Sequence, residues 1–187
     1  MLDVRDITAI ENRYVEGHEP SLEEAREALE ARLHAGARDR ETLLRLLFLE
    51  WYSIADDGFY TGLECDWPIE TRFVARFEEL GGMDSSDPEL IYVVGVMANA
   101  FPYYIGDEKK WEEIGSTLLS RYAALPPEHQ LRPEHFRGRG AYGAYFEHQL
   151  TAEVSGRLLP VWWHPWPWVR AIRRVARALG WPMKPLG

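Results

Sequence analysis

Apolar residues recur along most of the chain with the three- and four-residue spacing of helices, and polar turns separate the periodic stretches. The first stretch covers Val4–Val15. The second begins at Ser21, where Ser21 and Glu24 have the spacing of an S-x-x-E capping box. The third, residues 41–55, is apolar on most sides, which predicts a central helix. Patterns typical of strands are scarce.

The second half of the chain contains further signals for helix starts and stops. Residues 69–82 form a periodic stretch that ends at a Gly-Gly pair. Asp87 is placed to cap the following helix, with Pro88 at its first position, and Pro102 is expected to kink or end that helix. Asp107 is placed to cap the next one. A specific residue therefore explains each of these predicted helix boundaries.

Seven or eight helices joined by short polar loops predict an all-α fold, built as an array of antiparallel helical hairpins. Residues 91–125 resemble a tetratricopeptide repeat, with Gly95 at the close-contact position and a turn at Gly106–Asp107. They differ from that family by about one extra helical turn before Gly106, and by Gly115 where a larger residue is usual. The resemblance implies a groove that binds another protein.

The charges are distributed unevenly along the chain. The 187 residues include 30 Asp and Glu against 21 Lys and Arg, a formal charge of −9. Residues 1–156 hold all of the acids and carry −15, whereas residues 157–187 carry +6. We therefore divide the chain into an acidic helical domain, 1–156, and a cationic tail, 157–187. The acidic domain disfavours nucleic acid and attracts basic partners.

The tail joins a Trp-Pro segment to a short amphipathic helix. Pro165 and Pro167 exclude a continuous helix through the Trp-rich part. Three roles are open: packing on its own acidic domain, contact with an anionic membrane surface, or docking into another chain, which would give a homo-oligomer. The side chains expected to dock are Trp162, Trp163, Trp166, Trp168, Arg170, Arg173, Arg174 and Arg177.

Signals for catalysis and metal binding are weak. The six histidines include no H-E-x-x-H motif and no i, i+4 pair, so we expect no metal and no cofactor. Glu134–His135 and Glu147–His148 could supply an acid and a base in a pocket. A hydrolase-type enzyme that uses the carboxylate and histidine pairs of residues 128–148 is therefore an alternative to binding.

A last helix is predicted for residues 133–156. The Arg-Gly-Arg-Gly sequence at 137–140 could cradle an anion with backbone N–H groups and guanidiniums. The other interpretation, which we favour, is that Gly140, Gly143 and Ala144 form a small-residue face that lets another helix come close.

Two further features bear on location. No apolar run approaches the roughly 18 to 20 residues that cross a bilayer, and the N-terminus has acids where a signal peptide would be apolar. Cys65, the single cysteine, excludes an intrachain disulfide and fits a reducing compartment, although nothing in the sequence gives it a role. We expect a cytoplasmic protein.

Binding of another protein is the function that these patterns favour over catalysis. Acidic residues would steer a basic partner, and aromatic side chains near loops would anchor it. Among bacterial proteins, an immunity-type protein that neutralises a basic toxin is the concrete hypothesis, and a membrane-surface adaptor held by the tail is a further alternative. The expected binding face consists of Asp56, Asp57, Tyr60, Asp66, Trp67, Tyr103 and Tyr104.

Overall fold

The computed structural model describes residues 2–19, 21–55, 61–64 and 69–154. Within these residues the chain is helical and has no strand, which confirms the all-α class. None of the described helices is both long and apolar enough to span a bilayer. The helices are α1 (Val4–Val15), α2 (Glu23–His34), α3 (Arg40–Ala55), α5 (Glu70–Glu79), α6 (Pro88–Ala100), α7 (Pro102–Ile105), α8 (Glu108–Ala123) and α9 (Gly140–Val154), with short 3-10 turns η1 (Gly82–Asp84), η2 (Pro127–His129) and η3 (Pro133–His135).

The predicted caps of the second half of the chain are confirmed. The Asp87 carboxylate accepts a hydrogen bond from the amide of Glu89 at the start of α6, and Pro88 occupies the first helical position. Asp107 caps α8 by accepting from the Lys110 amide at 2.9 Å. Because a proline cannot continue a helix, α6 ends at Ala100 and α7 begins at Pro102.

The start of α2 differs from the predicted capping box. The Ser21 hydroxyl accepts from the Glu23 amide rather than from Glu24, and it donates to the carbonyl of Gly62. The backbone of Leu22 also bonds to Thr61. Ser21 therefore ties α2 to residues 61–64, a contact 41 positions away that local spacing cannot reveal.

The single helix predicted for residues 133–156 is also wrong. The chain forms η3, then a turn in which Gly138 and Gly140 have φ of +73° and +66°, and only then α9. L-amino acids with side chains rarely adopt these angles, so the two glycines interrupt the helical pattern. His135 and His148 consequently lie on different elements.

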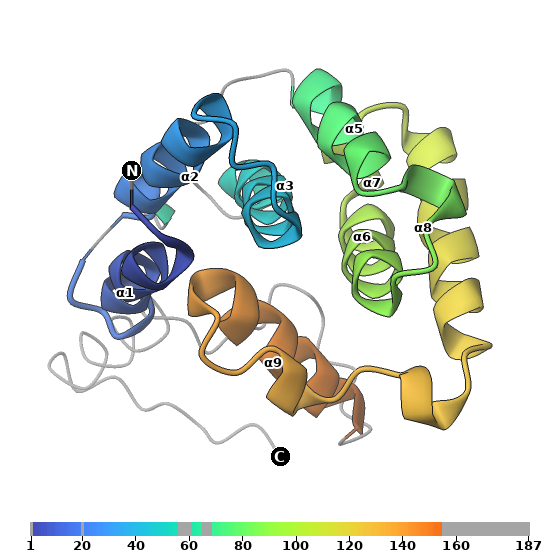
Figure 1. Ribbon diagram of the computed structural model, residues 1–187. Coiled ribbons are helices and arrows are strands. Elements are labelled where there is room, and N and C mark those ends of the chain that lie inside the picture. Colours follow the sequence, from blue (N-terminus) through green and yellow to red (C-terminus); the bar gives the residue numbers. More distant parts are fainter. Residues whose placement is uncertain (1, 20, 56–60, 65–68, 155–187) are drawn as a thin grey trace, which may run out of the picture.

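α3 lies at the centre of the described structure, as its apolar pattern predicts. It contacts α2, α5, α7 and α9, and Figure 1 shows it enclosed by the other helices. Aromatic side chains fill the space between α3 and α9: the Phe48 ring is stacked on Tyr52 at 5.0 Å and lies 5.4 Å from Tyr145. This cluster joins the middle of the chain to its last described helix.

α6 and α8 form a closely packed antiparallel hairpin. Gly95 of α6 lies against Leu119, and Gly115 of α8 lies against the backbone at Asn99. Gly115, the residue that departs from the tetratricopeptide pattern, therefore allows the close approach of the two helices.

The first and last described helices are also in contact. α9 packs against α1 (Figure 1), whereas in a simple array of hairpins each unit contacts only its neighbours. The hairpins α2–α3 and α6–α8 are present, but the α1–α9 contact was not part of the predicted arrangement. A small-residue face at the start of α9 was predicted, and Gly140 does lie against α1, where an added Cβ would overlap Glu11.

Candidate functional site

An aromatic surface forms where α6 turns into α8 through α7. The Phe101 ring lies 5.4 Å from Tyr104, and the rings of Tyr103 and Tyr104 are 4.5 Å apart. Tyr103 is 47% exposed; among the described residues, Leu2 is the other exposed large apolar side chain. The turn that Pro102 imposes thus presents two adjacent tyrosines at the surface of a fold that covers most of its aromatic residues.

Carboxylates from two helices border this aromatic surface. Partial desolvation, with smaller contributions from Tyr104 and Glu108, raises the pKa of Tyr103. The Glu70 side chain of α5 lies against the backbone of Gly106. Glu108, at the start of α8, is exposed and forms no ion pair with any described residue. Tyrosines next to unpaired carboxylates are a suitable surface for a cationic partner.

The structure brings two of the predicted binding residues together. Tyr103 and Tyr104 share α7. The Trp51 ring in the last turns of α3 lies 6.0 Å from Phe101, so the end of α3 at Ala55 is close to the aromatic surface. The remaining predicted binding and docking residues lie outside the described residues: Asp56, Asp57, Tyr60, Asp66, Trp67, Trp162, Trp163, Trp166, Trp168, Arg170, Arg173, Arg174 and Arg177.

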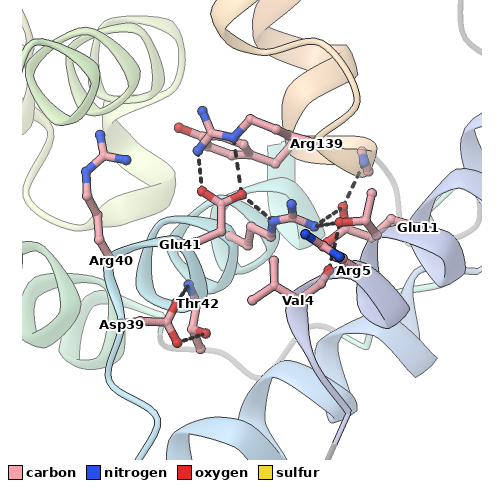
Figure 2. A network of polar contacts seen from close by, with 12 residues as sticks. Val4, Arg5, Glu11, Asp39, Arg40, Glu41, Thr42 and Arg139 are labelled. Atoms are coloured by element: carbon pink, nitrogen blue, oxygen red, sulfur yellow. Dashed lines mark hydrogen bonds and ion pairs between the residues drawn. The ribbon is translucent and has the colours of Figure 1, made fainter.

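A second feature is a connected network of charged side chains between α1, α3, α6 and the start of α9. Figure 2 shows its part around Glu11, Glu41 and Arg139. Glu41 of α3 accepts from Arg45 at 2.8 Å and from the Nε and Nη2 atoms of Arg139. Arg139 continues to Glu89 of α6 at 2.7 Å. Arg45 donates in the other direction, to Glu11 of α1. One chain of contacts thus links α1, α3 and α6 through Arg139, the residue just before α9.

The network continues from Glu89 towards the surface. The Tyr142 hydroxyl donates to Glu89 at 2.5 Å, and Arg40 contacts Glu89 at 2.8 Å and Asp87 at 2.6 Å. Although burial opposes it, Arg139 and Arg45 hold the pKa of Glu41 below its ordinary value. The Glu41 carboxylate is therefore ionised and neutralised in place.

The paired state of the network limits its chemistry. Arg45 is 2% exposed, and Arg139 bonds to Glu41 and Glu89 while lying 5.0 Å from the Tyr142 ring. These guanidiniums already bind the chain's own carboxylates, so few of their N–H groups are free to bind an external anion. Arg137 pairs with Glu147 at 3.2 Å. The contacts therefore favour packing over anion binding for the Arg-Gly-Arg-Gly sequence.

A smaller buried network joins α2, α3 and α5. Arg72 donates to Glu50 at 2.9 Å, and Arg76 lies between Glu50 and Glu30, the latter at 2.5 Å. Burial lowers the pKa of Arg76. Because removal of one partner leaves an uncompensated buried charge, this network fixes α5 on α3.

The Glu–His pairs proposed for catalysis have other contacts. The Nδ1 atom of His135 accepts from the Arg132 amide at 3.1 Å, and Glu147 is bound to Arg137. Burial lowers the pKa of His148. Within the described residues, no group of three or more His, Cys, Asp or Glu side chains is arranged to hold a metal ion.

The two networks were not predicted from the sequence, although one signal was available. Arg45 and Glu50 lie in the α3 stretch that is apolar on most sides. A charge inside a helix that must be buried requires a partner from another element. The sequence therefore indicated that buried ion pairs exist at these positions, but not which helices supply the partners.

Comparison with known proteins leaves the site to be interpreted from its geometry. No protein-family model, curated protein sequence or solved structure matches this chain.

Proposed function

We propose that the protein binds another protein, with a basic surface, through the aromatic surface of α7. The exposed Tyr103 beside Tyr104 carries this proposal. Aromatic side chains, tyrosine among them, are enriched at the energetic centres of protein interfaces because they bury a large area at low entropic cost. Most other aromatic side chains in the described helices are covered by the fold.

The charge of the chain supports a basic partner. Residues 1–156 carry a formal charge of −15. Glu108 acts on Tyr103, and Glu70 lies against Gly106, two residues after Tyr104. Such a field accelerates association with cationic proteins and weakens as salt is added. An immunity-type protein that neutralises a basic toxin is the concrete form of this proposal, and it requires no metal and no cofactor.

Affinity capture with salt washes tests the proposal. Full-length protein is immobilised, incubated with lysate of the source cells, washed at low and at high salt, and the retained proteins are identified by mass spectrometry. The expected result is a basic protein that high salt releases. Titration of that purified partner against Tyr103→Ala and Tyr104→Ala should then show affinity losses of about 2 kcal/mol each, roughly thirtyfold.

Leu2→Ala is the matched control, because Leu2 is exposed to a similar extent, 44%, but lies next to the start of α1. It should leave the affinity unchanged. Equal affinity of the partner for the wild type and both tyrosine variants would show that the α7 surface is not the binding site. Retention of the partner at high salt would show that attraction between opposite charges does not hold the complex together.

A further inference from the structure

Glu11 is buried in an unusual way. Its side chain is 0% exposed, and it lies between α1 and the start of α9. The Oε2 atom accepts from the Ala141 amide at 2.9 Å and lies 3.3 Å from a nitrogen of Arg45. The Oε1 atom has no hydrogen-bond partner among the described residues. One half of a fully buried carboxyl group is therefore satisfied and the other half is not.

The sequence places this carboxyl group where an apolar side chain would ordinarily pack. Glu11 shares the buried face of α1 with Ile7 and Tyr14. It reaches the first amides of α9 because Gly140 has no side chain, and the positive end of a helix dipole favours a negative charge there. The α1–α9 contact is thus built around a titratable group.

The positive charge that faces Glu11 is shared. Arg45 of α3 also donates to Glu41 at 2.8 Å and to the Thr8 hydroxyl at 2.9 Å. Glu41 itself repels a negative charge on Glu11. α2, which also packs against α1, contributes Glu24, but that carboxylate pairs with Arg13 at the surface. An ionised Glu11 is therefore only partly compensated.

We infer that Glu11 is a proton-binding site that couples the closure of α1 against α9 to pH. When the two helices close, the buried carboxylate takes a proton from solvent at its unpartnered oxygen, Oε1. The Oε2 atom keeps its hydrogen bonds to Ala141 and Arg45. When the helices separate, Glu11 becomes hydrated and returns the proton to water.

The direction of the pH effect follows from linkage. Burial, only partly opposed by Arg45 and the Ala141 amide, raises the pKa of Glu11 to about 7, from an ordinary value of 4.5. Between these values the closed form holds more protons than the open form, so the closed contact weakens as the pH rises through this window. Above about 7 both forms are ionised and the dependence ends.

Hydrogen exchange of the Ala141 amide, which donates to Glu11, tests this coupling in the full-length protein. Protection factors, corrected for the intrinsic pH dependence of exchange, are measured by NMR between pH 5 and pH 8. In the wild type the protection should fall on the order of fiftyfold across this range. Glu11→Gln, which keeps an acceptor but cannot ionise, should show less than about a twofold change.

Glu16→Gln is the control, because it removes a carboxylate just after the same helix, at an exposed position. It should behave as the wild type does. A pH-independent protection factor in the wild type, or the same fall in Glu11→Gln, would overturn the inference.

A direct titration keeps the inference testable if Glu11→Gln does not fold. The ¹³C shift of the Glu11 carboxyl carbon in the wild type should titrate with a midpoint near 7. A midpoint near the ordinary value of 4.5 would show that the closed contact binds no extra proton.

Discussion

At the scale of single residues, Gly140 determines how closely α9 approaches α1. Its φ of +66° is in the left-handed region, and an added Cβ would overlap the Glu11 carboxylate. We predict that Gly140→Ala lowers the free energy of unfolding by on the order of 3 kcal/mol, because backbone strain adds to displacement of a buried, hydrogen-bonded carboxyl group. Urea unfolding followed by circular dichroism measures this loss.

Gly138 separates the two contributions. Its φ of +73° is similar, but an added Cβ has no atom within 4 Å. Gly138→Ala should therefore show only the backbone strain, about 1 kcal/mol. Equal losses in the two variants would mean that the contact between Gly140 and Glu11 contributes nothing to stability.

At the scale of helices, the α6–α8 hairpin depends on two glycines with different surroundings. An added Cβ at Gly115 would lie 2.8 Å from the backbone nitrogen of Asn99, whereas at Gly95 it would lie 2.9 Å from the end of the Leu119 side chain. A side chain can rotate away, but a helix backbone must move as a whole. Alanine also favours the helix by about 1 kcal/mol over glycine.

We therefore predict different outcomes for the two alanine variants. Gly115→Ala should destabilise the protein by roughly 1–3 kcal/mol through overpacking, while Gly95→Ala should change the free energy of unfolding by less than about 1 kcal/mol. Thermal unfolding of the two variants beside the wild type tests the order. A larger loss of stability for Gly95→Ala than for Gly115→Ala would show that the contact at Gly115 is not the tightest one in the hairpin.

The helices could be predicted wherever a single residue marks the start or the end of a helix. Asp87, Pro102 and Asp107 act on their own neighbours in the chain, so their effect is visible in the sequence. The prediction failed across residues 133–156, because Gly140 was interpreted as part of a small-residue helix face and Gly138 as lying within the same helix. Their positive φ angles instead turn the chain before α9. A glycine pattern alone does not distinguish these two uses.

At the scale of the whole molecule, the contact between the first and last described helices was beyond the reach of sequence patterns. Arg139 bonds to Glu41, 98 positions earlier, and the Ala141 amide bonds to Glu11, 130 positions earlier. Nothing in the spacing of charged residues selects these partners. Of the residues expected to form the binding face, Tyr103 is exposed and Tyr104 half-buried on α7, beside the turn that Pro102 marks. Their role in binding stays a prediction.

The charge network between α1, α3, α6 and α9 should also govern how the whole fold responds to acid. Although burial opposes it, Arg139 and Arg45 lower the pKa of Glu41, and Arg40 likewise lowers that of Asp87. A lowered pKa stabilises the fold above the ordinary values of 4.5 and 3.8, and this stabilisation is lost as the pH falls through the lowered values. We therefore predict that the unfolding free energy decreases steadily below about pH 4.

Urea unfolding between about pH 2.5 and about pH 6, a range that includes the ordinary carboxyl pKa values, tests this prediction. Glu41→Gln should be less stable than the wild type at pH 6, and the difference should shrink as the pH falls, because the wild-type carboxylate becomes protonated as well. Glu113→Gln, on the exposed side of α8 and unpaired among the described residues, should follow the wild type throughout. A constant difference between Glu41→Gln and the wild type would assign the loss to packing, since protonation of Glu41 would then make no contribution to acid unfolding.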